Sequence, residues 1–390
     1  MLPEEQGLAR ERDRDAVAAF DRAGEPERPP EIAQPSLRRK GRGATLNPPV
    51  RFESRAVEAF DDGWSPPGEV ESPPPLATTL IRDQSRSAIA WNESPDIGFD
   101  RAVNPYRGCE HGCIYCYARP SHAYLGLSPG LDFETKIVFK PDLARLLERE
   151  ISRPGYQVKP IALGSNTDAY QPVERRLKLT RAVLELFERT GHPFTIVTKS
   201  AGVLRDLDII SRMAARNLAR VHVSLTTLDP VLARRMEPRA AQPASRLRAM
   251  AELARAGVPV GVMAAPMIPG LNDAELEQIL EAARRHGARH ASFVLLRLPH
   301  ELKELFENWL AEHVPERARH VLALVRETRQ GRLNDPNFHA RMRGSGPYAA
   351  LLAARFRRAA KAHGLAEPAP ALDCGQFVRP GAPGRQLSLI

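Results

Sequence analysis

The chain has 390 residues, 43% of them hydrophobic and 26% charged, which suits a folded protein with a sizeable core and excludes a wholly disordered one. Lysine and arginine number 56, against 47 aspartate and glutamate residues, so the formal net charge is +9. Because residues 1–90 are slightly acidic, the positive excess falls on residues 91–390. Such a distribution is typical of a protein that meets a polyanion, although arginine enrichment throughout a chain produces it too.

No membrane-spanning or export segment is visible in the sequence. The first residues alternate in charge, and prolines and glycines interrupt the longest uncharged stretch, residues 256–272. We therefore expect a cytoplasmic protein with no membrane partner. Since cytoplasmic thiols stay reduced, the four cysteines are expected to be ligands or reactive groups before they are disulfides.

Residues 1–90 are predicted to form an extended or partly disordered arm. Paired and triple prolines, for example at residues 29–30 and 73–75, interrupt any helical period, and apolar residues are sparse. Short stretches of this arm, such as residues 56–60, are expected at most to dock on the folded body. We assign no independent fold here.

Residues 91–300 are predicted to form an α/β core. From about residue 135, short apolar runs typical of buried parallel strands alternate with amphipathic helical runs. The predicted strands are Lys136–Phe139, Pro160–Leu163, Phe194–Thr198, Arg220–Leu225, Val258–Ala264 and Ala291–Leu296. The predicted helices between them include Asp142–Ile151, Lys178–Arg189 and Asp273–His286. No glycine-rich dinucleotide or phosphate loop follows a strand, so a barrel is favoured over a doubly wound sheet.

The remaining residues are predicted to form a helical extension, residues 301–365, and a flexible tail, residues 366–390. The predicted helices of the extension are Glu301–Glu312, Pro315–Gln330 and Pro347–His363. The tail ends in Gln386-Leu387-Ser388-Leu389-Ile390, which resembles the pentapeptide that binds the bacterial sliding clamp. We therefore predict a sliding clamp as a partner. The alternative is that these apolar side chains fold back onto the protein's own surface.

The main chemical signal is a set of three cysteines, Cys109, Cys113 and Cys116, in a Cys-x3-Cys-x2-Cys spacing on a glycine-containing loop. Three thiolates within eight residues can hold three irons of a cubane cluster. The fourth iron then remains open to a small molecule. Two alternatives stay open at this point: a structural zinc site completed by His111 or His122, and three unrelated buried cysteines.

This spacing, with an aromatic residue (Tyr115) before the last cysteine, resembles the cluster motif of the radical S-adenosylmethionine (SAM) superfamily. The resemblance implies a partial (β/α)6 TIM-like barrel and a [4Fe-4S] cluster on the three cysteines, with SAM on the open iron. It implies reductive cleavage of SAM to a 5′-deoxyadenosyl radical that abstracts hydrogen from a substrate. It also implies an electron donor, a reductase or a flavodoxin- or ferredoxin-type protein.

Within that superfamily the chain resembles the spore photoproduct lyase-like group, which also has tyrosines on both sides of the third cysteine, here Tyr115 and Tyr117. We predict these two tyrosines as catalytic. The group binds SAM with a serine, a lysine and a serine at the second, third and fourth strand ends. The full set of predicted cofactor-binding residues lies at or after the strand ends: Ser165, Thr167, Asp168, Lys199, Ser224, Thr226, Arg235 and Ile268.

One position departs from the pattern of that group. Its members have a hydrogen-donating cysteine directly before the serine of the second strand end, and this chain has Gly164 there. Lesion-repair chemistry of the same type therefore does not carry over directly. Tyr117, or Cys374 brought in from the tail, is a candidate to return a hydrogen atom instead.

We therefore predict a radical SAM enzyme, lyase- or transferase-like, that acts on nucleic acid in DNA repair or base modification. The cysteine loop, the strand-end residues, the basic body and the clamp-like tail motivate this hypothesis. An alternative is a radical SAM enzyme that modifies a protein or a small metabolite. A second alternative, from a different class, is a non-catalytic binding module stabilised by a metal.

Overall fold

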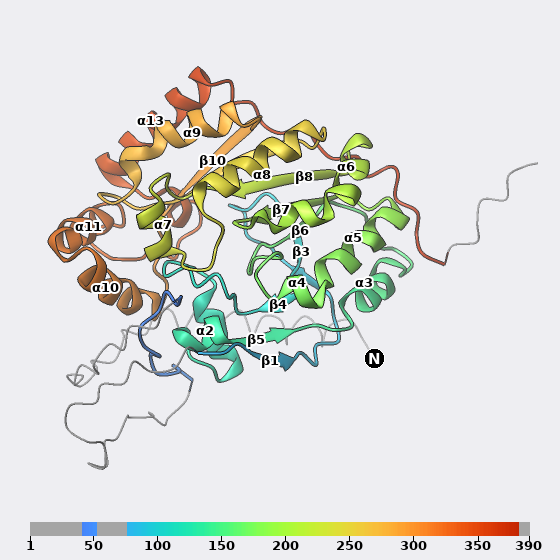
Figure 1. Ribbon diagram of the computed structural model, residues 1–390, viewed down its shortest axis with the longest axis horizontal. Helices are drawn as coiled ribbons and strands as arrows, with labels where there is room; N and C mark the ends of the chain where they lie inside the picture. Colours follow the sequence, from blue (N-terminus) through green and yellow to red (C-terminus); the bar gives the residue numbers. More distant parts are fainter. Residues whose placement is uncertain (1–40, 53–75, 382–390) are drawn as a thin grey trace, which may run out of the picture. The chain divides into compact units, whose positions relative to one another are not determined.

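Seven strands form the main sheet, in the order β10-β9-β8-β7-β6-β3-β2 (Figure 1). The computed structural model describes residues 41–52 and 76–381. Within that range β3, β6, β7, β8, β9 and β10 run parallel, and β2 pairs antiparallel with β3 at one edge. The sheet is thus the partial (β/α)6 barrel that the sequence predicts. The bounds are Ile89–Trp91 (β2), Arg101–Val103 (β3), Ile161–Leu163 (β6), Phe194–Thr198 (β7), Ala219–Ser224 (β8), Val260–Met267 (β9) and His290–Leu295 (β10).

A separate three-stranded sheet, in the order β1-β5-β4, contains the first of the predicted strands. Its members are Thr79–Arg82 (β1), Tyr106–Arg107 (β4) and Lys136–Phe139 (β5). The expectation that Lys136–Phe139 opens the barrel is therefore wrong. That place belongs to β3, which pairs in parallel with β6 through Ala102 and Ala162. With three residues, β3 is too short for its apolar pattern to stand out. Strand β1 and the first two residues of β2 lie in the segment assigned to the arm.

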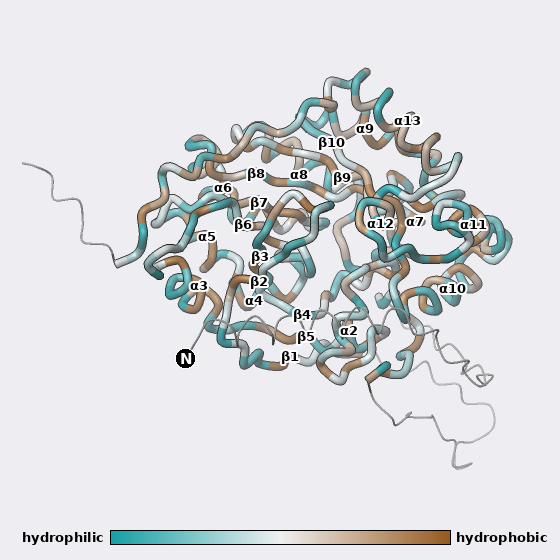
Figure 2. Tube along the Cα trace, turned by 180° about the vertical axis from the view of Figure 1, so that it is seen from behind, coloured by the Kyte–Doolittle hydropathy of each residue, from teal (hydrophilic) through white to brown (hydrophobic). Residues whose placement is uncertain are grey.

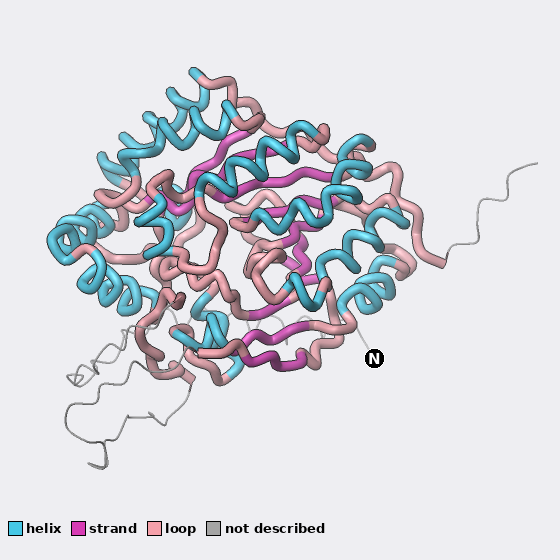
Figure 3. Tube along the Cα trace, in the orientation of Figure 1, coloured by secondary structure: helices cyan, strands magenta, loops and turns pink. Residues whose placement is uncertain are grey.

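Helices cover the outer side of the main sheet (Figure 3). Helix α3 packs on α5, α5 on α6, and α8 on both β8 and β9. Helix α5 shows why they form: Val183, Leu186 and Phe187 lie on its buried face, and it ends at Gly191, whose N–H bonds the carbonyls of the last turn in the left-handed conformation. The bounds are Leu131–Thr135 (α2), Leu143–Ile151 (α3), Glu174–Leu177 (α4), Leu179–Thr190 (α5), Leu207–Ala215 (α6), Pro230–Met236 (α7), Pro243–Arg255 (α8) and Leu276–Arg285 (α9).

The hydrophobic core lies between the parallel strands and these helices. Figure 2 shows apolar segments along the strands and hydrophilic segments mainly outside them. All three residues of β6 are buried, as expected for a parallel strand in the middle of a sheet. The buried cluster includes Leu163, Ile196, Val223 and Val262, one from each of four consecutive strands.

The C-terminal helices form a second cluster with the cysteine loop. Helices α10 (Leu302–His313) and α11 (Pro315–Glu327) contribute Phe306, Trp309 and Val321, which pack in one cluster with Ile114 and Tyr115. The extension also holds α12 (Ala340–Arg343) and α13 (Gly346–Ala362). The later helices therefore support the loop that carries the predicted ligands.

Part of the predicted tail is hydrogen-bonded to the core. Asp373 N donates to the Asn217 carbonyl at 3.0 Å, and Val378 N donates to the Thr190 carbonyl at 2.8 Å. Phe377 lies edge-on to the His192 ring. None of the helices in residues 41–52 and 76–381 combines the length and apolar character of a membrane-spanning segment.

Candidate active site

The three predicted cysteine ligands lie on one loop, between β4 and the short helix η1 (Arg119–Leu125). Cys109 N donates to the Phe133 carbonyl at 2.9 Å, and Ile114 N donates to the Met236 carbonyl at 3.0 Å. Cys116 N closes a turn on the Cys113 carbonyl at 3.2 Å. Backbone bonds to two other parts of the chain thus fix the course of the loop.

The three thiols form one largely buried group. Cys109 and Cys113 are each 7% exposed, and Cys116 packs against the clusters of both. Burial is the main cause that raises the pKa of each thiol, and the neighbouring cysteine charges add to it at Cys109 and Cys113. Arg119 and Lys199 oppose the shift at Cys116. Three clustered thiols with cations beside them are a donor set that fits an iron–sulfur cluster, whose irons supply the positive charge that thiolates need.

Two glycines give the loop its shape. Gly108 has φ +82°, and a Cβ there would lie 2.9 Å from the Phe133 carbonyl oxygen. Gly112 has φ +68°, and a Cβ there would lie 2.6 Å from the Glu134 carboxylate. Both positions combine a left-handed backbone with a close approach, so only glycine allows this path between the cysteines.

A buried ion pair that the sequence analysis missed supports the same loop. Arg119 is fully buried, and its guanidinium donates to the carbonyls of Cys113 at 2.9 Å and Gly112 at 3.1 Å. The same guanidinium pairs with the Glu134 carboxylate at 2.5 Å. Glu134 also accepts the backbone N–H groups of Gly43 and Ala44, at 2.9 and 2.8 Å. One short stretch of the N-terminal segment is thereby bound directly to the cysteine loop.

The two histidines considered for a zinc site have other partners. His122 is buried and its Nε2 bonds the Lys136 carbonyl at 3.0 Å, while burial lowers its pKa to about 4. His111 Nδ1 lies 3.4 Å from the Asp168 carboxylate. In the described ranges no three Cys, His, Asp or Glu side chains are arranged around a single metal position. The side-chain contacts of His122 and His111 are thus with a carbonyl and a carboxylate rather than with the cysteines.

Three predicted cofactor residues come together at the ends of β7 and β8. Lys199 Nζ donates to Ser224 Oγ at 2.6 Å, to Thr226 Oγ1 at 3.1 Å and to the Ala265 carbonyl at 3.3 Å. It also lies 5.5 Å from the centre of the Tyr115 ring. Burial, together with the nearby charge of Arg246, lowers the pKa of Lys199 to about 8. The lysine is thus a partly desolvated cation at the carboxyl ends of the strands.

A second buried pair, Glu237 with Arg246, organises this group, and the sequence analysis did not single out either residue as functional. The Glu237 carboxylate accepts from Tyr115 Oη, from Thr226 Oγ1 at 2.7 Å and from the Arg246 guanidinium, and Lys199 Nζ lies 3.3 Å away. Arg246 on α8 also donates to the Ser224 carbonyl at 3.0 Å. Burial raises the pKa of Glu237, and Arg246 opposes that shift. A buried carboxylate paired with two cations fits the expectation that interior charges are matched.

Other predicted residues at the second strand end bind the protein's own backbone. Thr167 Oγ1 donates to the Tyr106 carbonyl at 2.8 Å. The Asp168 carboxylate accepts from Thr198 Oγ1 at 2.7 Å and from Lys199 N at 2.7 Å, so it joins the ends of β6 and β7. Ser165 Oγ accepts from Asn104 Nδ2 at 3.4 Å. These side chains order the turns around Lys199.

Tyr117, Ile268 and Arg235 have different surroundings. Tyr117 is 50% exposed, its hydroxyl donates to the Ser165 carbonyl, and its ring centre is 5.7 Å from the Arg297 guanidinium. Ile268 is fully buried and its N–H donates to Asn272 Oδ1 at 2.7 Å. Arg235 donates to the His313 carbonyl on α10 at 3.0 Å, and its own carbonyl accepts from Trp309 Nε1 at 3.1 Å.

The two positions discussed for hydrogen return differ in place. Gly164 has φ +78°, and a Cβ there would lie 2.3 Å from the Val197 carbonyl oxygen. This backbone therefore excludes a cysteine at the position where the lyase-like group has one. Cys374 lies one residue beyond Asp373, which bonds Asn217 just before β8. That is the amino-terminal end of the strands, opposite to the cysteine loop.

The chain is similar to several known proteins. The family model described as the radical SAM superfamily matches residues 103–283. The uncharacterized protein Rv2578c of Mycobacterium tuberculosis is 36% identical over 287 residues, which cover 72% of this chain and 81% of that protein. The chain belongs to the radical SAM superfamily. The uncharacterized protein MJ0683 of Methanocaldococcus jannaschii is 27% identical over 196 residues, which cover 50% of this chain and 70% of that one.

Among solved structures, a spore photoproduct lyase complexed with dinucleoside spore photoproduct has a similar fold. The TM-score is 0.55 at 18% identity, over 73% of this chain and 79% of that one. As a radical SAM enzyme the protein uses a [4Fe-4S] cluster and SAM, and it needs an external reductant. The terminal segment Gln386–Ile390, predicted to bind a sliding clamp, lies outside the described residues.

Proposed function

We propose that this radical SAM enzyme acts on nucleic acid, in DNA repair or base modification, and that Cys109, Cys113 and Cys116 hold its cluster. The observation that carries the ligand assignment is the single buried group of three thiols beside Lys199. The nucleic-acid substrate is supported by the basic body of the chain and by a fold similar to that of a lyase complexed with a dinucleoside photoproduct.

In this proposal the strand-end residues bind SAM. When bound, the cluster and SAM supply a 5′-deoxyadenosyl radical that abstracts hydrogen. Lys199 offers a partly desolvated ammonium for the SAM carboxylate, and Ser224 and Thr226 orient that ammonium through their hydroxyls. Glu237 balances the charge and orients Tyr115 at the same time.

Tyr117 is assigned to the substrate side. Its half-exposed ring lies on the loop of the ligands, and Gly164 leaves no room for a cysteine at the position that the lyase-like group uses. A phenol hydroxyl at this place is the candidate that returns a hydrogen atom to the substrate radical, and one electron from the external reductant with one proton would restore the phenol from the phenoxyl radical left on Tyr117. Replacement of Tyr117 by Phe is expected to leave SAM cleavage intact and to change the product distribution.

Deuterium transfer tests the substrate. Reduced, cluster-loaded enzyme is incubated with SAM and with oligonucleotides deuterated at candidate positions. Label in 5′-deoxyadenosine, together with faster 5′-deoxyadenosine formation when nucleic acid is added, supports the proposal. Label only from a deuterated peptide or metabolite would move the protein to the other class of radical SAM substrate.

A further inference from the structure

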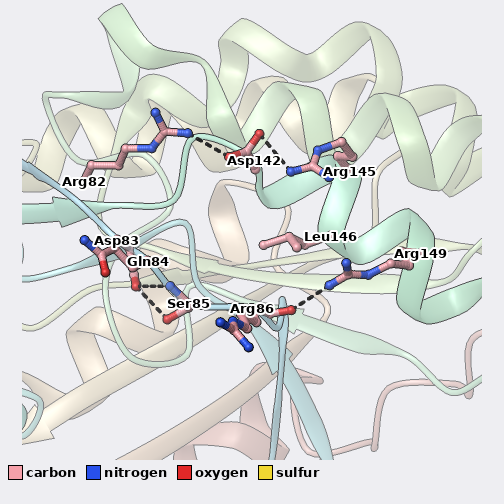
Figure 4. Close-up of a pocket in the computed structure, with 9 residues that line it drawn as sticks. All are labelled: Arg82, Asp83, Gln84, Ser85, Arg86, Asp142, Arg145, Leu146 and Arg149. Atoms are coloured by element: carbon pink, nitrogen blue, oxygen red, sulfur yellow. Dashed lines mark hydrogen bonds and ion pairs between the residues drawn. The ribbon is translucent and has the colours of Figure 1, made fainter.

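A groove lined by four arginines lies on the flank of the molecule, between the segment that follows β1 and helix α3 (Figure 4). Its volume is about 360 Å³. In Figure 4 the buried Leu146 lies between two arginine pairs, one on each side. The lining residues are Arg82, Asp83, Gln84, Ser85, Arg86, Asp142, Arg145, Leu146 and Arg149.

The positive charge of this groove is only partly neutralised. Arg82 and Arg145 share one carboxylate, that of Asp142, at 3.0 and 3.3 Å. The Arg149 guanidinium donates to the Arg86 carbonyl at 2.9 Å. In the described part of the chain neither the Arg86 nor the Arg149 guanidinium is paired with a carboxylate. The groove is therefore a site where exposed guanidinium groups face solvent from two walls.

Asp83 is the other acidic residue that lines the groove, and its charge is neutralised by a cation that does not line the groove. Its carboxylate pairs with Arg107 at 3.1 Å, and it also accepts from Ser85 Oγ at 2.6 Å. Hydrogen bonds with Ser85, together with the nearby cations Arg107 and Lys140, keep the pKa of Asp83 below its usual range against the effect of burial. Arg107 stands two residues before Cys109, so the groove is joined through one side chain to the start of the ligand loop.

A second hollow of about 490 Å³ lies farther along the same segment, whose Ala88 and Ile89 N–H groups bond Glu150 on α3, and it contains an aromatic ring. Arg86 and Arg149 line the groove, while Ile89 and Glu150 line the second hollow, so the two lie next to each other along the same segment. Trp91, on the edge strand β2, is 64% exposed there, with the Arg101 guanidinium 4.8 Å from its ring centre. An exposed indole beside cations is the combination with which proteins hold unpaired bases.

We infer that these two hollows form one nucleic-acid-binding groove, in which Arg86 and Arg149 contact backbone phosphates and Trp91 stacks on a base. The inference rests on the proposed nucleic-acid substrate and names a surface for it outside the cysteine site. Arginine forks match phosphate oxygens in pairs, which a shallow cationic groove without a deep pocket can use along a chain of phosphates. The occupant is a polynucleotide because an exposed ring that can stack on a base lies five residues from the exposed Arg86 on the same segment.

Binding of a fluorescent single-stranded oligonucleotide to the full-length, cluster-loaded protein tests this assignment. In the double variant Arg86→Glu/Arg149→Glu the affinity is expected to fall by about 10- to 100-fold at low salt, and the slope of log affinity against log salt by about two. The variant Trp91→Ala keeps the salt slope and loses about 5- to 100-fold in affinity, the range for loss of one stacked base. Trp91→Ala also guards against misfolding of the double variant.

A matched control changes the same net charge elsewhere. Arg319 and Arg357 are exposed on α11 and α13, away from β1 and α3 (Figure 1). The double variant Arg319→Glu/Arg357→Glu is expected to bind the oligonucleotide like the unmodified protein. Equal losses in the two double variants would show a general charge effect and overturn the inference, as would absence of oligonucleotide binding by the unmodified protein.

Two further readouts separate the sources of failure. Anionic phospholipid vesicles that bind through Arg86 and Arg149, when the oligonucleotide does not, would assign the groove to a membrane surface and overturn the inference. Deuterium transfer from a dinucleotide, which has a single internucleotide phosphate for the groove to contact, reports on the proposed function. If oligonucleotide binding depends on Arg86 and Arg149 but no nucleic acid transfers its label, the proposed substrate is wrong and the binding groove is still supported.

Discussion

Charged side chains at the carboxyl ends of the strands are buried and paired, whereas several of those on the flank of the barrel are exposed and have no carboxylate partner in the described residues. Lys199, Glu237 and Arg246 are largely buried, and each bonds the others or a neighbouring carbonyl. Arg86 and Arg149 on the flank are exposed and face no carboxylate in the described residues. Taking a charge out of water costs several kcal/mol unless it is paired, whereas an exposed cation keeps its hydration until a ligand replaces it. The fold fixes the first group and leaves the second available.

Removal of a proposed ligand is expected to have the largest effect. Cys113→Ala leaves two thiols for three irons, so iron content and 5′-deoxyadenosine formation both fall to background. Cys374→Ala, at the other end of the strands, is the matched control and should retain both. A Cys113→Ala protein with full iron content and SAM cleavage would contradict the ligand assignment.

Breaking a buried pair should cost far more stability than breaking an exposed one. Arg246→Met leaves the Glu237 carboxylate buried with one cation fewer and is expected to cost about 3–5 kcal/mol of unfolding free energy. Arg145→Met, which removes a 69% exposed partner of Asp142, should cost about 0–1 kcal/mol. Urea unfolding of the two variants measures the difference. Similar losses in both would remove the distinction between the two regions.

The sequence predicts the parts of this structure that depend on local pattern. Six apolar runs give strands that the structure confirms within a few residues, and the cysteine spacing indicates the chemistry through its resemblance to the radical SAM motif. The buried ion pairs could not be predicted in this way, because their partners are distant in sequence. Arg119 and Glu134 are 15 residues apart, and Glu237 and Arg246 are 9 residues apart. Nothing in their composition separates them from surface charges.

The short strands could not be predicted from the sequence either, because their backbone pairing depends on distant segments. β1 and β2 have four and three residues and lie among prolines, so their pairing depends on partners elsewhere in the chain. β1 pairs in parallel with β5, and β2 pairs antiparallel with β3. Only the tertiary arrangement therefore distinguishes these segments from an extended arm.

Two glycines, one at the strand ends and one on the flank, allow the cost of a left-handed backbone to be measured separately from the cost of a steric clash at Cβ. Gly164 and Gly155 both have positive φ, +78° and +82°, but a Cβ at Gly164 meets the Val197 carbonyl at 2.3 Å while none lies within 4 Å of Gly155. Gly155→Ala should cost about 1–2 kcal/mol for the left-handed conformation alone. Gly164→Ala should cost about 1 kcal/mol more, since the strand end must also shift. Equal unfolding free energies would show that the β6–β7 contact relaxes freely.

Buried His192 gives the smallest expected effect and a pH dependence of known sign. Its Nδ1–H donates to the Pro193 carbonyl at 3.0 Å and its Nε2 accepts from Tyr156 Oη at 2.8 Å, an arrangement that only the neutral ring can make. Burial lowers its pKa to about 4, below the value of the unfolded chain. Between that unfolded pKa of about 6.5 and the folded value, the unfolded state binds more protons, so stability falls as the pH falls.

At pH about 5 this one group should lower the unfolding free energy by about 1–2 kcal/mol relative to neutral pH. His192→Gln is expected to reduce the difference between the urea midpoints at the two pH values. His320→Gln, at an exposed position on α11, should leave that difference unchanged. If both variants keep the full pH dependence, protonation of the His192 ring does not contribute to it, and His122 and His222, whose pKa values desolvation also lowers to about 4, are the next groups to replace.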